Sequence, residues 1–249
     1  MRRLLFIICV FFLSVTAVMA QKEKVKNQPY ADLKWFHLGF HVGLHAQDLI
    51  LTNTGVATNG ETWYAEIPSY SPGFSVGVIG DMYLNPYFNL RFTPTIHFGD
   101  KKFVFRRPEM EGVEGTDENP GVSMYSTSVR SNYLTFPLDV KYSAFRVNNY
   151  RPYLIGGIYG AFDLGRKKGN PILLKGTDFG VEFALLMFPV VYLIYLPFFK
   201  LCPELKFSFG LVDLLEKDRS DLTDPELIKY PNSLSKATSR MVTLTFNFE

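Results

Sequence analysis

The chain has 249 residues, 47% of them hydrophobic and 16% aromatic, with a formal net charge of +2 at pH 7. Arg2 and Arg3 precede an apolar run that closes at Ala20, which is the pattern of a secretory signal peptide cleaved before Gln21. Without residues 1–20 the 26 basic side chains fall to 24, which equals the 24 acidic ones. A formally neutral mature chain gives no indication of a nucleic-acid or acidic-lipid partner.

The two cysteines limit the chemistry further. Cys9 lies in the middle of the apolar run of the signal peptide, a position that does not favour lipid attachment. Cys202 is then the single cysteine of the exported chain, so no internal disulfide is expected.

The stretch HLGFHVGLH, residues 37–45, places a histidine at every fourth position, namely His37, His41 and His45. A helix would put all three on one face, as in zinc sites, but Gly39 and Gly43 would each cost about 1 kcal/mol in a helix interior. As a strand, the stretch has one apolar row and one row of His and Gly. Histidines four residues apart on a strand lie about 13 Å apart, too far to share a metal ion. We therefore expect a strand without a metal site.

The same alternation of apolar and polar residues predicts strands along the rest of the chain. It is clearest over residues 134–142, 201–211 and 242–248, where large apolar side chains recur at every second position. Weaker cases are residues 74–84, 88–98 and 179–187. Residues 152–163 are harder to assign because three glycines, Gly156, Gly157 and Gly160, interrupt both rows. With the histidine stretch, these segments make eight candidate strands.

The connections between these strands alternate between long and short. Long ones are expected at about residues 53–70, 100–122, 165–176 and 213–237, and short turns at Asn85 and Pro86, at Asn148 and Asn149, and near Pro197. Barrels of the outer membrane have this asymmetry, with tight periplasmic turns and longer external loops. The prediction is an all-β membrane protein, an eight-stranded antiparallel up-and-down transmembrane β-barrel over residues 34–249. Residues 21–33 would form a periplasmic N-terminal leader.

The apolar row is expected to face lipid. Eight strands enclose an interior just wide enough for side chains, whereas a soluble sandwich or lipocalin-like barrel would have to enclose about forty large apolar residues. The inward row is rich in small polar residues and carries charges of both signs. We expect these charges to pair and to plug the lumen: Asp81, Arg91, Asp139, Lys141, Glu182, Glu204 and Lys206.

Aromatic residues gather near the expected short turns, as in the girdles of outer-membrane barrels. They are Tyr83, Tyr87, Phe88, Tyr150, Tyr153, Tyr192, Tyr195, Phe198 and Phe199. The uncharged stretch from Phe183 to Phe199 leaves a membrane helix as an alternative, but seventeen residues are few for a span and two prolines interrupt it. A long sixth strand with a bulge at Pro189 and a turn near Pro197 is the preferred interpretation.

No catalytic motif accompanies the four histidines, so neither an enzyme nor a cofactor is expected. Ser128 or Ser131 near a histidine stays open as a lumenal nucleophile. Asp139 and Glu204 have the character of an acid and base pair, but Lys141 and Lys206 two residues away favour ion pairing.

The external loops carry their own signals. Basic residues from Lys101 to Arg107 precede acidic residues from Glu109 to Glu118, which predicts a solvated charged loop or blocks that fold back on each other or meet a partner. In the last loop, the run from Thr223 to Glu226 has a proline at the first helical position and predicts a short helix.

Four segments carry a family resemblance: NYLTFPLDVKYSAF (132–145), YRPYLIGGIYGAF (150–162), YLPFFKLCPELKFSFGL (195–211) and the closing SRMVTLTFNFE. Together they resemble the PorT family of outer-membrane β-barrels, over most of the mature chain. The resemblance implies a component of the type IX secretion system of Bacteroidetes, needed for export of proteins with a conserved C-terminal signal and, in gliding species, for motility. It implies no catalytic residues. The apolar stretch from Leu185 to Ile194 is longer than expected for this family.

The functional expectation is a non-enzymatic accessory of protein secretion in the bacterial outer membrane. Expected partners are outer-membrane lipid, other type IX secretion components and, during biogenesis, the barrel-assembly machinery. The residues that resemble the signal read by that machinery are Val242, Leu244, Phe246 and Phe248, although Glu249 displaces the terminal aromatic by one. An adhesin or ligand-binding barrel acting through its external loops, and a lipid-modifying enzyme of the outer leaflet, are the alternatives.

Overall fold

The computed structural model describes residues 27–58, 60–68, 70–108, 124–165, 172–184, 192–219 and 225–249. Strands dominate them: β1 (Phe36–Asn53), β2 (Tyr64–Glu66), β3 (Ser71–Tyr83), β4 (Phe88–Phe92), β5 (Thr95–Phe98), β6 (Asp100–Arg106), β7 (Met124–Arg130), β8 (Tyr133–Ser143), β9 (Tyr150–Asp163), β10 (Thr177–Ala184), β11 (Tyr192–Tyr195), β12 (Lys200–Gly210) and β13 (Leu234–Phe248). The helical pieces are short: the 3₁₀ turns η1 (Ala31–Leu33) and η3 (Pro225–Ile228), and α2 (Lys229–Asn232). No helix in these ranges has the length and apolarity needed to cross a membrane.

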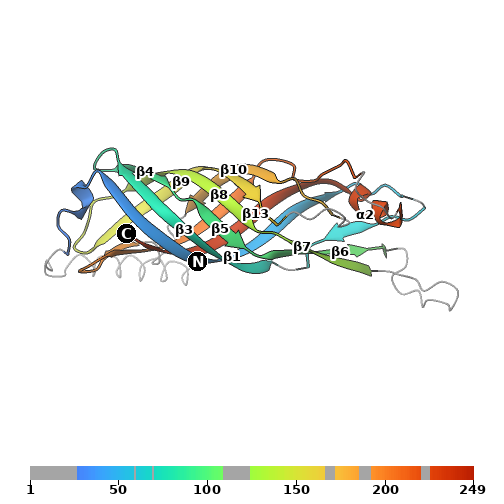
Figure 1. Cartoon of the computed structure of the whole chain (residues 1–249), viewed down its shortest axis with the longest axis horizontal. Coiled ribbons are helices and arrows are strands. Elements are labelled where there is room, and N and C mark those ends of the chain that lie inside the picture. The colour runs from blue at the N-terminus through green and yellow to red at the C-terminus, as the bar shows by residue number, and fades with distance from the viewer. Residues whose placement is uncertain are drawn as a thin grey trace, which may run out of the picture.

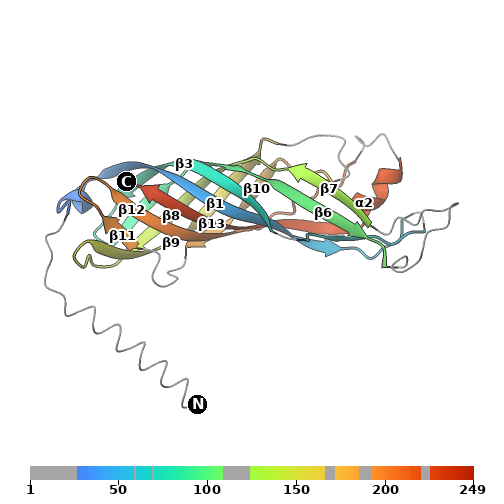
Figure 2. The same cartoon turned by 90° about the horizontal axis from the view of Figure 1, so that it is seen from below.

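Ten of these strands close into a ring. β1 pairs with β13 and β3, β8 pairs with β9, and β12 pairs with β13, all antiparallel. β4 and β5 both lie between β3 and β8, and β10 and β11 both lie between β9 and β12, so each couple fills one place in the wall. The ring therefore has eight places, and the predicted eight-stranded antiparallel barrel is confirmed (Figures 1 and 2).

The two ends of the barrel differ. The short connections between β3 and β4, β8 and β9, and β11 and β12 lie at one end with the C-terminus, on the left in Figure 1, which we call the turn end. β6, β7 and α2 extend beyond the ring at the opposite end, which we call the loop end. The long connections predicted from the sequence all belong to the loop end.

The outside of the wall is apolar, as predicted. On β1 the outward row from Phe36 to Leu44 is 42–74% exposed, whereas the alternate residues His41 and His45 are buried. Other strands repeat the pattern with exposed Phe74, Val76 and Val78 on β3, and Phe136, Leu138 and Val140 on β8. A wall that exposes large apolar residues on most of its strands requires a lipid environment.

The strands run further at the loop end than the sequence predicted. β1 continues to Asn53, β13 begins at Leu234, and residues 100–106 and 124–130 form the hairpin of β6 and β7 instead of a loop. With β2 this hairpin makes a second, three-stranded sheet. Beneath it lies an apolar cluster, the cap core: Leu49, Trp63, Ala65, Phe103, Phe105, Val129, Ile172, Leu174, Leu214, Leu215, Tyr230, Leu234 and Ala237. The loop end is thus a folded cap, because side chains of four connections bury one another there.

The sixth place in the wall is interrupted. From Ala184 to Ile194 the chain advances ten positions, whereas the partners on β12, Lys206 and Leu201, are five positions apart. The chain between β10 and β11 is therefore five residues longer than the neighbouring strand. The predicted bulge at Pro189 falls in residues 185–191, outside the described ranges. The predicted turn near Pro197 is present between β11 and β12, and the strands on both sides rule out a single helix over residues 183–199.

Two members of the predicted aromatic girdle are misplaced. Tyr153 and Tyr195 are each 1% exposed and belong to an apolar cluster inside the barrel with Ile155, Ala184 and Cys202. Sequence reasoning grouped them with outward aromatics because they lie near turns, but their positions in the strand alternation direct them inward. Of the remaining predicted residues, Tyr87, Phe88, Tyr150, Phe198 and Phe199 are exposed at the turn end.

Candidate functional site: the lumen and its two ends

The histidine row of β1 lies opposite a row of small and acidic residues on β3. His37, His41 and His45 are the register partners of Asp81, Gly77 and Gly73. A Cβ atom at Gly77 would lie 2.5 Å from His41 Cε1, and one at Gly73 would lie 2.3 Å from His45 Nε2. The imidazole rings thus occupy the space that side chains would take on β3. Because Gly73 and Gly77 are four residues apart on β3, the two histidines that fill these spaces are four residues apart on β1.

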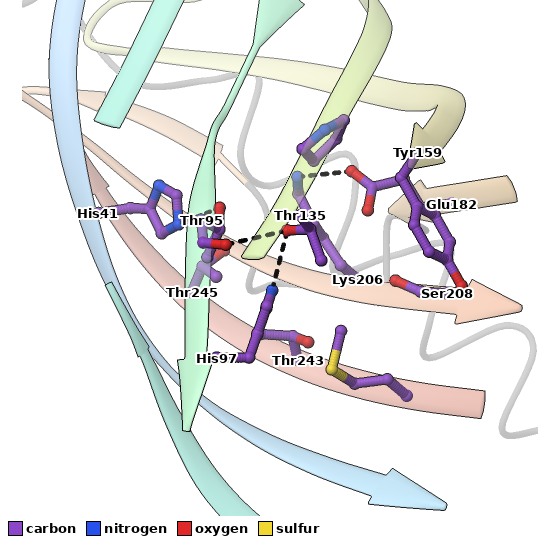
Figure 3. Close-up of a pocket in the computed structure, with 12 residues that line it drawn as sticks. His41, Thr95, His97, Thr135, Tyr159, Glu182, Lys206, Ser208, Thr243 and Thr245 are labelled. Atoms are coloured by element: carbon purple, nitrogen blue, oxygen red, sulfur yellow. Dashed lines mark hydrogen bonds and ion pairs between the residues drawn. The ribbon is translucent and has the colours of Figure 1, made fainter. Parts of the chain in front are cut away.

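His41 on β1 and His97 on β5 line a small polar chamber in the middle of the lumen (Figure 3). His41 Nε2 lies 3.0 Å from Thr95 Oγ1, and His97 Nε2 lies 3.2 Å from Thr135 Oγ1. The rings of His45 and His97 meet edge to face at 5.1 Å. The chamber has a volume of about 30 Å³, enough for about two water molecules and too small for an organic substrate. In the part of the chain that the structure describes, no three His, Cys, Asp or Glu residues are placed to hold a metal ion.

An arginine on β4 fills the lumen on the turn-end side of this chamber. Arg91 is fully buried and lies 3.1 Å from Asp81 Oδ2 and 2.6 Å from Glu204 Oε1, and it also contacts Glu249. Lys141 contacts Asp81 at 3.2 Å and Glu249 at 3.8 Å. These charges come from β3, β4, β8, β12 and the residue after β13, so the network spans the barrel interior.

The other three of the predicted lumenal charges form a separate group. Lys206 Nζ lies 3.0 Å from Glu182 Oε1 and 3.5 Å from Asp139 Oδ2. The seven residues are thus distributed over two clusters, with Asp81, Arg91, Lys141 and Glu204 in one and Asp139, Glu182 and Lys206 in the other. Sequence reasoning missed Glu249 and Tyr153, whose hydroxyl donates to Glu204 at 2.6 Å. Glu249 could have been found, since it continues the inward row of Thr243, Thr245 and Asn247.

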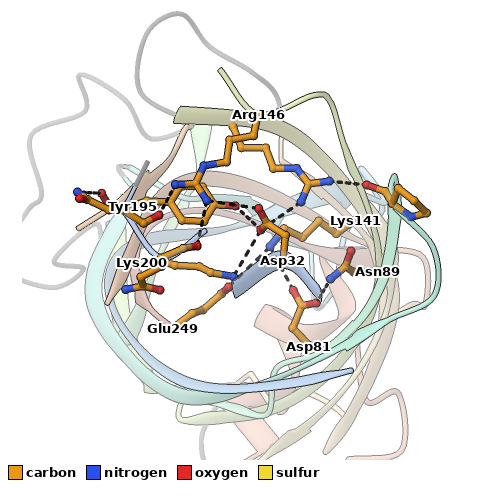
Figure 4. A network of polar contacts seen from close by, with 12 residues as sticks. Asp32, Asp81, Asn89, Lys141, Arg146, Tyr195, Lys200 and Glu249 are labelled. Atoms are coloured by element: carbon orange, nitrogen blue, oxygen red, sulfur yellow. Dashed lines mark hydrogen bonds and ion pairs between the residues drawn. The ribbon is translucent and has the colours of Figure 1, made fainter. Parts of the chain in front are cut away.

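The leader contributes a carboxylate at the turn end of the barrel (Figure 4). Asp32 lies 3.3 Å from Arg151, 3.6 Å from Arg146 and 3.8 Å from Lys200, and it accepts a hydrogen bond from the Tyr195 hydroxyl. Burial alone would raise the pKa of this carboxyl. The hydrogen bond from Tyr195 and the three cations outweigh burial, so the pKa of Asp32 lies below its usual value.

The cap closes the loop end. Its basic residues, predicted to lie in a charged loop, contact other residues of the cap and the lumen. Lys101 is buried and donates a hydrogen bond to the Tyr133 hydroxyl at 2.9 Å, at the loop end of the lumen. Arg107 and Lys229 both pair with Glu61, at 2.5 Å and 3.1 Å. The acidic residues from Glu109 to Glu118 lie outside the described ranges. η3 begins at Pro225, where a short helix was predicted, and residues 220–224 before it are likewise not described.

Comparison with protein families decides the class of this barrel. A model described as an outer membrane protein beta-barrel domain matches residues 19–216. The chain belongs to this outer-membrane β-barrel family. With the barrel placed in the outer membrane, the turn end faces the periplasm and the loop end faces the outside, because outer-membrane barrels have short periplasmic turns.

The remaining comparisons add little. No curated protein matches. Solved structures similar to this chain include OprG from Pseudomonas aeruginosa (9% identity, TM-score 0.42, covering 86% of this chain and 93% of that one). Neisserial surface protein A is 9% identical with a TM-score of 0.36, covering 86% of this chain and 98% of that one. AlkL in lipid bilayers is 10% identical with a TM-score of 0.34, covering 92% of this chain and 93% of that one. At these scores the similarities carry no argument about what the outer-membrane barrel does.

The last strand of the outer-membrane barrel holds the residues that resemble an assembly signal. Val242, Leu244, Phe246 and Phe248 lie on β13 between β12 and β1. Phe248 stacks on Phe40 with ring centroids 5.0 Å apart. The closing strand therefore joins both ends of the chain in one seam of the wall.

Among the described residues, the hydroxyl of Ser131 has no hydrogen-bond partner, so it is not activated by a histidine. Ser128 is exposed on β7, and Ser131 is buried between β7 and β8. His41 and His97 contact threonines, and Asp139 and Glu204 each lie beside a cation.

Proposed function

We propose that this outer-membrane barrel is a non-enzymatic accessory of protein secretion, of the type IX, PorT-like kind, which acts through its surfaces and not as a conduit. The observation that carries the proposal is the Arg91 network, which occupies the lumen with charges from five places in the chain. The folded cap covers the loop end of the same lumen, and the leader lies at its turn end. A polypeptide has no passage through such a lumen, so a role in export must use the wall or the ends.

The type IX assignment is supported by the four segments that resemble the PorT family. Three of them are now placed on β8, β9 and on β11 to β12, and the fourth on β13. They include Asp139, Lys141, Tyr153, Glu204 and Lys206, which contribute to the two charge clusters. The resemblance therefore extends to residues that fill the lumen.

The absence of an enzymatic role is part of the same proposal. Each lumenal carboxylate discussed above has a cation within 4 Å, so ion pairing already engages these groups inside the barrel. The central chamber has room for water alone.

Two experiments test the proposal. Deleting the gene should leave proteins with the type IX C-terminal signal inside the cell envelope, and the wild-type gene should restore their export. Affinity purification from gently solubilised outer membrane should recover other export components, with an unrelated eight-stranded barrel from the same membrane as control. Full export by the deletion strain would refute the secretion role.

A second function, ligand binding outside the cell, is favoured by the shape of the cap. A pocket of about 460 Å³, within the range of ligand sites, has Leu215 and Leu234 in its wall and Thr54, Val56 and Lys217 at its edge. Replacing Val56 and Lys217 by Asp and Glu should abolish binding to host or environmental ligands while export continues. Normal binding by this variant would count against an adhesin that uses the pocket.

A further inference from the structure

The leader makes contacts at the turn end that are typical of a bound peptide. Asn27 donates its backbone N–H to Asn149 Oδ1 at 2.8 Å and its side-chain amide to Tyr195 O at 3.0 Å. Gln28 donates its side-chain amide to Leu196 O at 3.0 Å. In return, Arg146 donates to the main-chain carbonyls of Asn27 and Gln28. The barrel therefore recognises backbone groups of the leader as well as side chains.

The same surface holds one carboxylate with cations from different elements. Arg146 lies in the turn before β9, Arg151 on β9 and Lys200 on β12, and Asp32 pairs with all three. The Tyr195 hydroxyl on β11 completes the shell. We call these barrel residues the rim site: Arg146, Asn149, Arg151, Tyr195 and Lys200. In the described ion pairs, Asp32 of the leader supplies the carboxylate, and Arg146, Arg151 and Lys200 of the rim site supply the cations. The rim site is therefore cationic.

The described contacts of the leader are mainly polar. Among its described side chains Ala31 is buried, at 7% exposure, whereas Tyr30 is 75% exposed. Gln28 has a φ of 48°, a left-handed conformation that is strained for a residue with a side chain. Polar contacts of this kind can be made by any segment that offers the same charged and hydrogen-bonding groups, whereas packed apolar side chains require a matching shape. The attachment is therefore of a kind that another segment with the same groups could replace.

We propose that the rim site is a peptide-binding site which the chain's own residues 27–32 occupy in this state. Its second occupant would be an extended segment of another polypeptide in the periplasm that carries an acidic residue. The tethered leader competes at high effective concentration, so the exchange depends on weakening the contact of Asp32. The inference requires the periplasmic position of the turn end but not the secretion role, so the two fail independently.

The test uses the peptide NQPYADL, the sequence of residues 27–33, with a fluorescent label, and the full-length protein in detergent micelles. Fluorescence anisotropy should show about tenfold tighter binding to the Asp32→Asn variant than to the wild type, because the tethered competitor has lost its charge. The matched control peptide has Asn in place of its Asp and should bind the variant about as weakly as NQPYADL binds the wild type. Adding Arg146→Gln to Asp32→Asn should abolish the gain.

Equal binding of NQPYADL to the wild type and to Asp32→Asn would overturn the proposal, as would equal binding of the two peptides. Heat-modifiable migration in gels checks that each variant is folded. A second measurement needs no variant: excess NQPYADL should increase hydrogen exchange of residues 27–32 in the wild-type chain. Unchanged exchange at saturating peptide would also refute displacement.

Discussion

Arg91 contacts carboxylates from three different places in the chain, Asp81, Glu204 and Glu249, with its side chain fully buried. Burying one cation is costly, and the cost is offset because several acceptors surround it with hydrogen bonds. The same arrangement makes the carboxylates dependent on the arginine. Arg91 is therefore the residue whose loss should affect the lumen most.

Replacing Arg91 with Met should destabilise the barrel by about 3–5 kcal/mol, because it leaves buried carboxylates without their cation. Urea unfolding of the protein in lipid vesicles measures the change. Arg106 is the control: it is half exposed and pairs with Glu66 at 3.5 Å, so Arg106→Met should change stability by less than about 1 kcal/mol. Equal effects of the two variants would show that the Arg91 network is not structural.

The glycines of β3 permit a second test at the scale of residues. Gly77→Ala should destabilise the barrel by about 1–3 kcal/mol, since the new methyl group meets His41 and the Pro94 carbonyl, each at 2.5 Å. Gly156→Ala on β9 is the matched control, because nothing lies within 4 Å of the added atom. The same unfolding assay compares them, and a neutral Gly77→Ala variant would contradict the packing of His41 against β3.

At the scale of elements, alternation predicted the wall because each strand in the membrane has lipid on one side and the lumen on the other. Past Gly99 the alternation reverses: Lys102 and Arg106 point outward and Phe103 and Phe105 inward. Water replaces lipid there, so the apolar row turns to the cap core. This reversal is visible in the sequence, but the basic residues from Lys101 to Arg107 and the acidic ones after them also predict a charged loop.

Other features were beyond a single sequence. The alternating rows of each strand show which side chains enter the lumen, but not which of them contact one another. Arg91 and Glu204, for example, are in contact although they are 113 residues apart in the sequence. The contact of Asp32 with the rim site depends on the path of a leader that has no periodic pattern. Pairing of the lumenal charges could be expected from their confinement, whereas the division into two clusters depends on the register of the strands.

The leader should respond to pH. The pKa of Asp32 in the folded protein lies below its value in an unfolded chain, about 3.9, so its stabilising contact is present above that pH and is lost as the pH falls further. A spin label at Tyr30→Cys should therefore be immobile at pH 7 and become mobile below about pH 3.9. In the Asp32→Asn background the label should be mobile throughout. The same pH transition in both proteins would contradict the role of Asp32.

The cap should unfold separately from the barrel. Trp63 is buried in the cap core, so Trp63→Ala should destabilise the cap by about 3–5 kcal/mol while the strands within the membrane keep their protection. Hydrogen exchange resolved by segment measures both regions. Val56→Ala, at a position 64% exposed, should change neither. Simultaneous loss of protection in β8 and β9 would show that cap and barrel form one cooperative unit.

At the scale of the whole molecule, three obstructions lie along the barrel axis, and Figure 4 shows Asp32 of the leader inside the ring of strands. The cap core covers the external end, the Arg91 network fills the lumen, and the leader with Asp32 crosses the periplasmic end. The cap core is held by apolar packing and the other two by different sets of polar contacts, so loss of one leaves the others in place. The protein is accordingly a closed barrel in the outer membrane that presents surfaces on both sides of the membrane.

Electrical conductance across a planar lipid bilayer tests this closure most directly. After insertion of the wild-type protein, verified by protection of its strands from protease, the bilayer should show no stable current steps under applied voltage. Deletion of residues 27–32 alone should leave it silent, because the Arg91 network and the cap stay in place. A steady, ion-conducting channel formed by the wild-type protein would contradict the closed lumen.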